Sequence, residues 1–246
     1  MQLSDIGMII ADTPRAKTYV QALVQNELAP NLVLIMKSAS DDLLPGQTST
    51  NTVGSIHVIP DQFSTVGFVF KPSEPIEDTL THSRISFHYV PSVDINSDTV
   101  IGAIQESTET VFIYSGFGGA ILRDKILSIG KKFLHVHGGY LPDYKGSTTN
   151  YYSLINENNC GATSIFMEEE IDSGPVLIRR KFPPPKNRRE IDYIYDSVFR
   201  AQVLVETIQK FSRDGGWHFE VPNNCGGETY FVIHPVLKHI AILSNL

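Results

Sequence analysis

Two histidines and one aspartate are the residues of this 246-residue chain that are best suited to do chemistry. His135 and His137 lie two positions apart in the apolar run 133–137, which predicts a short strand with both imidazoles on one face. Asp172 lies in the later acidic stretch 168–172, which we expect to form a turn that faces the loop after His137. Neighbouring imidazoles and a carboxylate can move protons and orient one another. These three side chains are therefore the candidate catalytic residues.

The loop that follows this strand is the second feature with functional meaning. Gly138-Gly139 stops the strand, and residues 141–146 predict an irregular loop before the helical run 147–156. Open α/β sheets bind ligands at loops that follow strand ends. A ligand site is therefore expected here.

Together these segments resemble the N10-formyltetrahydrofolate-dependent formyltransferases. In that family a strand with Asn-x-His leads into a loop of the form Leu-Pro-x-(Tyr/Trp)-(Arg/Lys)-Gly, and an Asp follows later in a segment like Asp-x-Gly-Ile-Asp-Thr-Gly. His137 matches the family's His, the loop Leu141-Pro142-Asp143-Tyr144-Lys145-Gly146 matches the loop, and Asp172 matches the Asp. His135 departs from the pattern, because it stands where the family has Asn.

An upstream stretch carries a further match to the same family. The residues Gly119-Ala120-Ile121-Leu122 begin a segment similar to the turn that lines the family's pterin pocket. The resemblance is good over residues 110–181 and weaker over the first 50. It implies folate contacts at Phe117, Gly118, Gly119, Ile121, Leu122, Met167, Glu168, Glu169 and Ile171. Tyr144 and Lys145 are the candidate contacts to the acceptor, with the alternative that they only fill the loop.

The resemblance further implies a role for each candidate catalytic residue. His137 would stabilise a tetrahedral oxyanion and shuttle protons with Asp172 hydrogen-bonded near it, while residue 135 would donate a hydrogen bond to the formyl oxygen. A neutral imidazole at His135 supplies one N–H donor, in one tautomer only. Because two adjacent imidazoles disfavour double protonation, one of them would be held neutral as a donor while the other serves as the base.

Simpler interpretations remain open for all of these residues. The two histidines would be hydrogen-bonded structural groups at a strand end, residues 117–122 an ordinary strand-to-helix turn, and residues 168–170 a solvated turn. His135, His137 and Asp172 also form the inventory of a two-His, one-carboxylate site for Fe²⁺ or Zn²⁺, which would indicate a hydrolase or oxygenase. We assign no metal ligand, because the intervening loop follows the folate family and no metal-binding pattern.

Composition narrows the partners and the compartment. A formal net charge of −7 and a pI near 5.6 disfavour nucleic-acid binding that depends on neutralising many phosphates. No apolar run approaches the ~20 residues that a membrane span needs. Cys160 and Cys225 have neither metal-ligand spacing nor the density of a disulfide-rich secreted domain, so we expect free thiols in a cytoplasmic protein.

The order of the predicted elements indicates an α/β protein with a mostly parallel twisted sheet, organised in three layers as in the formyltransferases. We expect strands near residues 6–11, 32–36, 66–70, 85–90, 111–116, 133–137, 162–167 and 175–182, and helices near 15–26, 97–106, 123–129, 147–156 and 190–211. Residues 38–60 predict a long loop. No Gly-x-Gly-x-x-Gly follows the first strand, which disfavours a nicotinamide enzyme. We divide the chain into a catalytic domain, 1–185, and a C-terminal helix with a β-containing tail, 186–246.

The function predicted from the sequence is transfer of a formyl group from N10-formyltetrahydrofolate to the amine of a small acceptor. A nucleotide-linked amino sugar is the first acceptor we expect, with an amino acid or another small metabolite next. The tail would complete the acceptor site or form the contact of a homodimer. Two alternatives share the folate pocket: a formyltetrahydrofolate hydrolase, and a folate-binding homologue in which His135 has abolished transfer.

Overall fold

The computed structural model describes residues 2–38 and 62–244. The long loop predicted over residues 38–60 lies, after its first residue, outside these ranges.

A seven-stranded sheet forms the centre of the molecule, in the order β10-β9-β7-β6-β1-β2-β5. The strands are β1 Gln2–Ala11, β2 Ala29–Met36, β5 Ser86–Val90, β6 Val111–Ser115, β7 Lys132–His137, β9 Cys160–Phe166 and β10 Val176–Phe182. The five strands from β5 to β7 pair in parallel, and β9 is antiparallel to both of its neighbours. The predicted α/β class with a mostly parallel sheet is confirmed.

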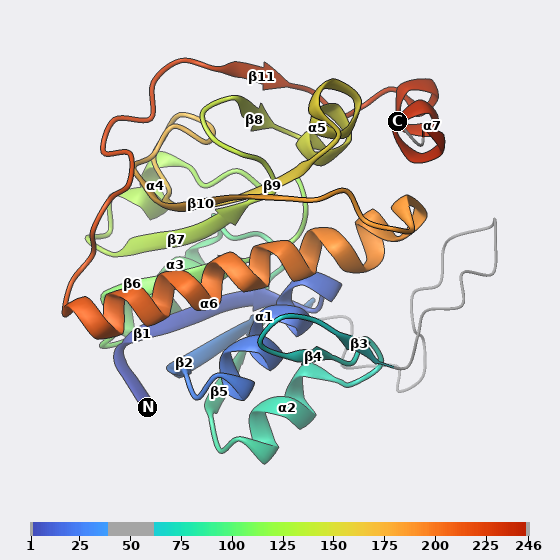
Figure 1. The fold of residues 1–246 in the computed structure, drawn as a ribbon. Helices are drawn as coiled ribbons and strands as arrows, with labels where there is room; N and C mark the ends of the chain where they lie inside the picture. Colours follow the sequence, from blue (N-terminus) through green and yellow to red (C-terminus); the bar gives the residue numbers. More distant parts are fainter. Residues whose placement is uncertain (1, 39–61, 245–246) are drawn as a thin grey trace.

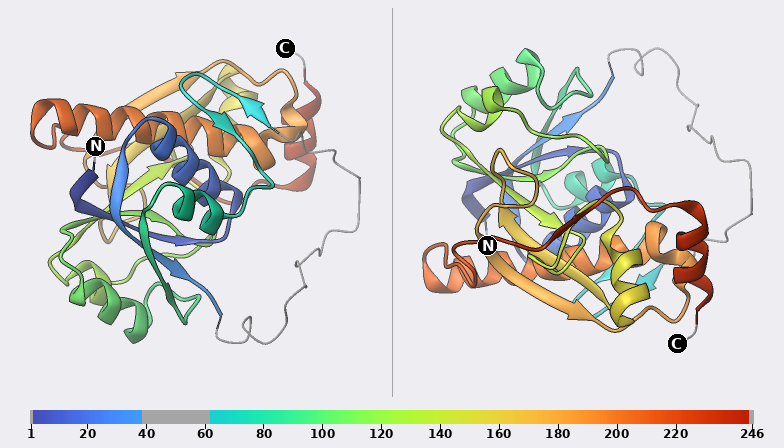
Figure 2. Two further views of the ribbon diagram at one scale, coloured as in Figure 1. Left: turned by 90° about the horizontal axis from the view of Figure 1, so that it is seen from below. Right: turned by 90° about the horizontal axis from the view of Figure 1, so that it is seen from above.

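Helices cover both faces of this sheet, which makes three layers (Figures 1 and 2). One face packs against α1 Pro14–Gln25, α2 Ile76–His82 and the long α6 Asp196–Asp214, and the other packs against α3 Asp98–Glu106 and the short α4 Asp124–Leu127. Thr13 caps α1 by accepting from the backbone N–H of Ala16 at 3.1 Å, and Ser97 caps α3 as the sequence predicts. Good caps therefore fix where both helices begin.

Strand alternation divides the core into two clusters. Met8 and Ile10 of β1 pack on the α1 and α6 side, whereas Ile9 packs on the α3 side. Burying such a side chain fully stabilises the fold by about 1.5–3 kcal/mol. In β7 the same alternation sends Leu134 and Val136 to the α6 side. His135 and His137 therefore point to the opposite face of the sheet.

Some predicted elements differ from the structure. The single strand expected over 66–70 is a small hairpin of β3 Phe63–Ser64 and β4 Val69–Phe70, because Gly67 takes a positive φ of 92° in the turn between them. The helix α2 was not predicted. Part of the loop expected over 141–146 forms the short strand β8 Tyr144–Gly146, which pairs in parallel with β11 Glu228–Tyr230 in the tail.

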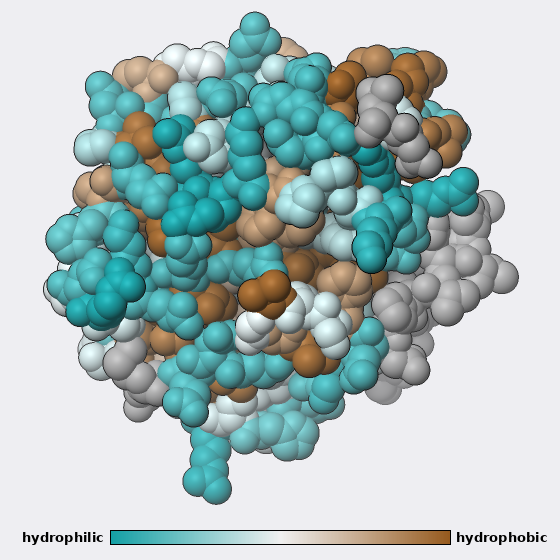
Figure 3. All heavy atoms as spheres, in the orientation of Figure 1, coloured by the Kyte–Doolittle hydropathy of each residue, from teal (hydrophilic) through white to brown (hydrophobic). Residues whose placement is uncertain are grey.

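The tail ends in a helix that packs on an earlier helix of the chain. α5 Thr149–Glu157 follows β8, and α7 Pro235–Leu243 packs on α5. Hydrophobic residues gather at the surface where α7 lies (Figure 3). Four apolar side chains of this helix are at least two-fifths exposed: Val236, Leu237, Ile240 and Leu243. No helix in the described ranges combines the length and the apolar character that a membrane crossing requires.

Candidate active site

The carboxyl end of β7 brings the two histidines to the rim of a cavity of about 500 Å³. His135 pairs in register with Ile165 of β9, and His137 pairs with Thr163. The His135 ring lies 6.2 Å from the ring of Tyr114 on the neighbouring strand β6. Both histidines line the cavity, with His137 only 4% exposed.

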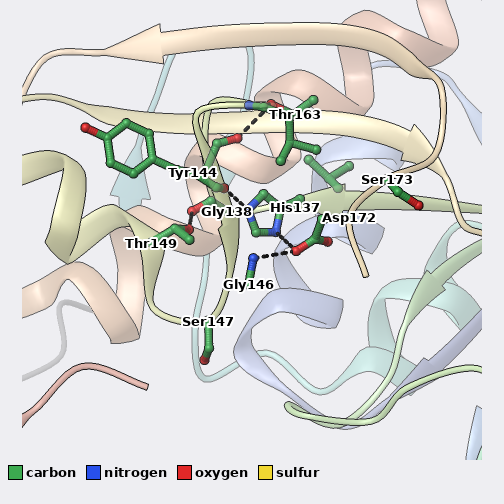
Figure 4. A network of polar contacts seen from close by, with 12 residues as sticks. His137, Gly138, Tyr144, Gly146, Ser147, Thr149, Thr163, Asp172 and Ser173 are labelled. Atoms are coloured by element: carbon green, nitrogen blue, oxygen red, sulfur yellow. Dashed lines mark hydrogen bonds and ion pairs between the residues drawn. The ribbon is translucent and has the colours of Figure 1, made fainter. Parts of the chain in front are cut away.

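The His137 ring is held at both nitrogens (Figure 4). Its Nε2 lies 2.8 Å from the carbonyl oxygen of Tyr144, and its Nδ1 lies 3.3 Å from Oδ2 of Asp172. Because a carbonyl oxygen only accepts, Nε2 carries a hydrogen. In a neutral ring Nδ1 then presents a lone pair to the carboxylate, so this contact is attractive only when a proton lies between the two groups. The pair is built to hold one proton.

Asp172 is fixed by its backbone as well as by its side chain. Its φ is 52°, a left-handed conformation that costs a non-glycine residue about 1–2 kcal/mol. Oδ2 accepts from the backbone N–H of Gly146 at 2.8 Å. The side-chain amide of Asn224 donates to the carbonyl oxygens of Asp172 and Gly174, at 2.7 and 3.2 Å. Asn224 thus holds the backbone of the turn that carries Asp172.

Backbone and hydroxyl contacts shape the loop between β7 and α5. A side chain at Gly139 would place its Cβ 2.6 Å from both His137 Nε2 and the Tyr144 carbonyl oxygen, so only glycine leaves their hydrogen bond room. The Thr163 hydroxyl donates to the carbonyl oxygen of Gly139 at 2.6 Å and accepts from the N–H of Leu141 at 3.1 Å. The Thr149 hydroxyl donates to the Gly138 carbonyl oxygen. These bonds preset the loop around the imidazole.

The two residues predicted to contact the acceptor lie elsewhere. Tyr144 is buried, its hydroxyl donates to Glu157 at 2.9 Å, and its ring stacks on Tyr230. Lys145 is also buried and donates to the Asn224 carbonyl oxygen at 3.1 Å. Neither side chain is among those that line the cavity. Both residues therefore join the loop to the tail and lie outside the cavity lining.

All of the residues predicted to contact folate line the same cavity as the histidines: Phe117, Gly118, Gly119, Ile121, Leu122, Met167, Glu168, Glu169 and Ile171. Three apolar side chains at this end are exposed, with Phe117 at 38%, Ile121 at 54% and Ile171 at 48%. A Cβ at Gly118 or Gly119 would meet no atom within 4 Å. Exposed apolar side chains around open space fit a flat ring such as a pterin.

Two arginines that the sequence analysis missed give the inner part of the cavity its charge. Burial first, and then the charges of Arg15 and Arg200, hold the pKa of His135 well below its ordinary value of 6.5. His135 is therefore neutral at pH 7. Burial also lowers the pKa of His137, against the opposing effect of Asp172. Arg200 forms an ion pair with Asp196 at 2.8 Å and donates to the carbonyl oxygen of Val136 at 3.1 Å.

The signals for the missed residues differ. Arg15 is the second residue of α1 and comes shortly after the end of β1 at Ala11, and a cation placed soon after a strand is a signal that the sequence does contain. Arg200 lies inside α6 and is 64 residues from Val136, whose carbonyl oxygen it contacts. Asn224 lies in the tail and is 52 residues from Asp172. The sequence around each of these residues contains no signal for its contact.

No group of three or more His, Cys, Asp or Glu side chains is arranged to hold a metal ion in the part of the chain that the structure describes. The two-His, one-carboxylate alternative thus has no observation in its favour.

Comparison with known proteins points in one direction. The family model described as "Formyl transferase" matches residues 19–201. The chain is 28% identical over 166 residues to a methionyl-tRNA formyltransferase of Lactiplantibacillus plantarum, covering 62% of this chain and 52% of that protein. It is 27% identical over 189 residues to one from Synechococcus sp. (strain JA-2-3B'a(2-13)), covering 72% and 57%. The chain therefore spans about half the length of these curated relatives.

Solved structures share the fold. A sugar N-formyltransferase from Shewanella sp. FDAARGOS_354 superposes with a TM-score of 0.56 at 14% identity, covering 98% of this chain and 87% of that one. A 4-N formyltransferase from Francisella tularensis gives a TM-score of 0.57 at 13% identity, covering 97% and 86%.

Proposed function

Because the chain belongs to the formyl transferase family, we propose that it transfers a formyl group from N10-formyltetrahydrofolate to the amine of a small acceptor. One observation carries the proposal. The contact between His137 and Asp172, at 3.3 Å, lies at the wall of the same cavity that contains every residue predicted to bind folate. This arrangement supports a site in which the formyl donor and the proton-transfer groups meet.

The apolar end of the cavity would hold the pterin of the donor. Phe117, Ile121 and Ile171 offer apolar surface, and the backbone of residues 168–171 offers polar atoms for the ring edge. The donor supplies the formyl carbon that the amine attacks. Its N10–carbon bond breaks as the new nitrogen–carbon bond becomes permanent, and N10 must gain the proton that the amine loses.

Asp172 and His137 would accept that proton. Both nitrogens of His137 are engaged, whereas Asp172 lines the cavity and uses Oδ2 for its contacts with His137 and Gly146. In this proposal the proton passes from the amine to Asp172, where His137 helps to hold it, and then from Asp172 to N10 as the N10–carbon bond breaks. A positioned acid–base group of this kind contributes about 10²–10⁴-fold to a rate.

His135 would act as a neutral hydrogen-bond donor to the formyl oxygen. Its Nδ1 is buried without a hydrogen-bond partner, and its lowered pKa keeps the ring uncharged. A neutral imidazole can donate one hydrogen bond to an oxygen that becomes negative, as a carboxamide does. Donation from Nδ1 requires the tautomer in which Nδ1 carries the hydrogen, and in that tautomer the other ring nitrogen gives up its hydrogen bond to the backbone of Tyr114.

The acceptor that we propose first is a nucleotide-linked amino sugar. Two proteins of similar fold over nearly the whole chain are named a sugar N-formyltransferase and a 4-N formyltransferase. The net charge of −7 disfavours an acceptor that is held through many backbone phosphates, as a tRNA would be.

The test is to incubate the purified protein with N10-formyltetrahydrofolate and a panel of nucleotide-linked amino sugars and amino acids. Tetrahydrofolate, formate and formylated amine would each be quantified. We expect tetrahydrofolate to form only when a suitable amine is present, and the rate to fall by about 10²-fold or more in Asp172→Asn. The matched control Asp143→Asn removes an exposed carboxylate from the same loop region and should leave the rate unchanged. Formate release without any amine would instead indicate a hydrolase, and folate binding without any product would indicate a silent homologue.

A further inference from the structure

The inner end of the cavity holds a cation that no carboxylate neutralises. Arg15 lines the cavity and donates from Nε to the Ser115 hydroxyl at 3.1 Å and from Nη2 to the Gly116 carbonyl oxygen at 2.7 Å. Among the described residues no carboxylate lies within ion-pairing distance of Arg15, and the nearby Asp196 is paired with Arg200. Arg15 is partly buried, and cations that are removed from water are normally paired with an anion. Arg15 therefore lacks a charged partner.

Two other polar groups beside Arg15 also lack partners. The hydroxyl of Tyr114, a residue only 3% exposed that lines the cavity, has no hydrogen bond, and neither has Nδ1 of His135. Both lie near Arg15 and near each other. A Cβ at Gly116 would be 2.4 Å from the Tyr114 hydroxyl, so this hydroxyl adjoins the Gly116 backbone to which Arg15 donates. The rings of Tyr114 and His135 are 6.2 Å apart.

The topology explains why a ligand would bind at this point. Chain order reverses between β1 and β6, because β1 continues to β2 on one side while β6 lies on its other side. Crevices at such a reversal, outside the carboxyl ends of the strands, are where open α/β sheets bind ligands. Arg15 lies in the first turn of the twelve-residue helix α1, which carries no acidic residue in that turn. The helix N-terminus therefore adds a further partial positive charge.

We propose that Arg15 and Tyr114 form a subsite for an anionic group of the acceptor, a carboxylate or a phosphate. This inference rests on the proposed function, and it identifies the place in the cavity where the negative charge of the acceptor is held. Oxygen atoms of such a group accept from the Arg15 guanidinium and from the Tyr114 hydroxyl, so that Arg15 gains a charged partner and the Tyr114 hydroxyl gains a hydrogen bond. The site adjoins His135, so the charge would lie close to the reacting amine.

A binding experiment tests the subsite without any need for turnover. The melting temperature would be measured in inorganic phosphate and in acetate at constant ionic strength, with chloride as the reference. We expect at least one of the two anions to raise it in the wild type, with a loss of affinity on the order of 10- to 100-fold in Arg15→Gln. Lys17→Gln is the matched control, because Lys17 lies in the same helix and pairs with Asp12 outside the cavity. The larger of the two responses distinguishes a phosphate site from a carboxylate site.

Tyr114→Phe guards against loss of folding in Arg15→Gln. It removes a hydroxyl that has no partner, so it should leave the melting temperature without added anion unchanged or higher and weaken the anion response. Arg15→Lys should restore part of the response, since it keeps the charge but not the fork of donors. Equal anion responses in the wild type, Arg15→Gln and Tyr114→Phe would overturn the subsite.

Turnover then separates this inference from the proposed function. Three probes of similar size would be compared as acceptors: ethanolamine, phosphoethanolamine and β-alanine. We expect kcat/KM to be at least tenfold higher for one of the charged probes than for ethanolamine, and the ratio to fall towards one in Arg15→Gln. Equal use of neutral and charged amines would overturn the subsite and leave formyl transfer intact. Anion binding that depends on Arg15, with no amine formylated in any assay, would overturn formyl transfer and leave the subsite.

Discussion

Replacing Asn224 tests whether its hydrogen bonds hold the turn that carries Asp172 in place. Asn224→Ala removes the donor to the carbonyl oxygens of Asp172 and Gly174 and leaves the backbone contact to Lys145 in place. Each carbonyl left unpaired in a buried site costs about 1–3 kcal/mol. Because one of the two is only partly buried, we expect the free energy of unfolding to fall by about 2–3 kcal/mol.

The effect on turnover should be larger than stability alone explains. Asp172 has a left-handed backbone that is unfavourable by about 1–2 kcal/mol, so it will relax once the clamp is gone. A displacement of about 1 Å at a catalytic group can cost 10²-fold in rate, and we expect kcat to fall by about that factor. Urea unfolding and single-turnover formyl transfer measure the two quantities.

Three further variants make the Asn224 result decisive. Asn223→Ala changes the exposed neighbour and should alter neither quantity. Leu23→Ala creates a cavity in the distant core, with a loss of about 2–5 kcal/mol and unchanged kcat at a temperature where the protein is folded. In an Asp172→Asn background, Asn224→Ala should have little further effect on kcat, since both changes act on one group. If Asn224→Ala loses stability and keeps its full kcat, the clamp does not position Asp172.

Three other predictions follow from the same structure. His135 is neutral when folded and has its ordinary pKa of 6.5 when unfolded, so its contribution to stability is complete above pH 6.5 and is lost as pH falls below it. Between pH 7.5 and 5.5 the free energy of unfolding should fall by about 1 kcal/mol on this account, and urea unfolding of His135→Asn should show a smaller fall than the wild type. Gly146→Ala puts a Cβ 2.1 Å from the Tyr230 carbonyl oxygen at a φ of 93°, so it should break the β8–β11 pairing and speed hydrogen exchange in these two strands. The control Gly102→Ala in α3 places its Cβ where no atom lies within 4 Å, and it should stabilise the helix by about 0.5–1 kcal/mol. Thr163→Val leaves the Gly139 carbonyl oxygen and the Leu141 N–H unpaired, and thermal and urea unfolding should show that the free energy of unfolding falls by about 2–4 kcal/mol. The control Thr18→Val removes only a hydrogen bond to the preceding helical turn, so it should lower the free energy of unfolding far less.

The central part of the site could be predicted from the sequence because its residues lie close together in the chain. The alternation in β7 puts His135 and His137 on one face, and the glycines after it end the strand in a loop, as predicted. The family resemblance drawn from these residues is confirmed by the match over residues 19–201. The roles of His135, His137 and Asp172, the homodimer and the division at residue 185 stay predictions.

Contacts between distant segments were not predictable in the same way. Lys145 reads as a loop cation, and only the folded chain shows that its Nζ meets the carbonyl oxygen of Asn224. Arg200 lies in a helix with an ordinary apolar face, and its contact with Val136 depends on how α6 crosses the sheet. Such pairings are set by packing, and no periodicity or spacing in one sequence encodes them.

The junction of β8 with β11 has a consequence for the order in which the protein is made on the ribosome. Lys145 is translated 79 residues before Asn224, so the segment with both histidines emerges well ahead of the strand and the amide that brace it. Domains begin to fold while synthesis continues from the N-terminal side. The sheet from β5 to β10 can therefore assemble first, and the nascent polypeptide gains a finished reaction centre only when the segment from Asn224 to Tyr230 has been translated.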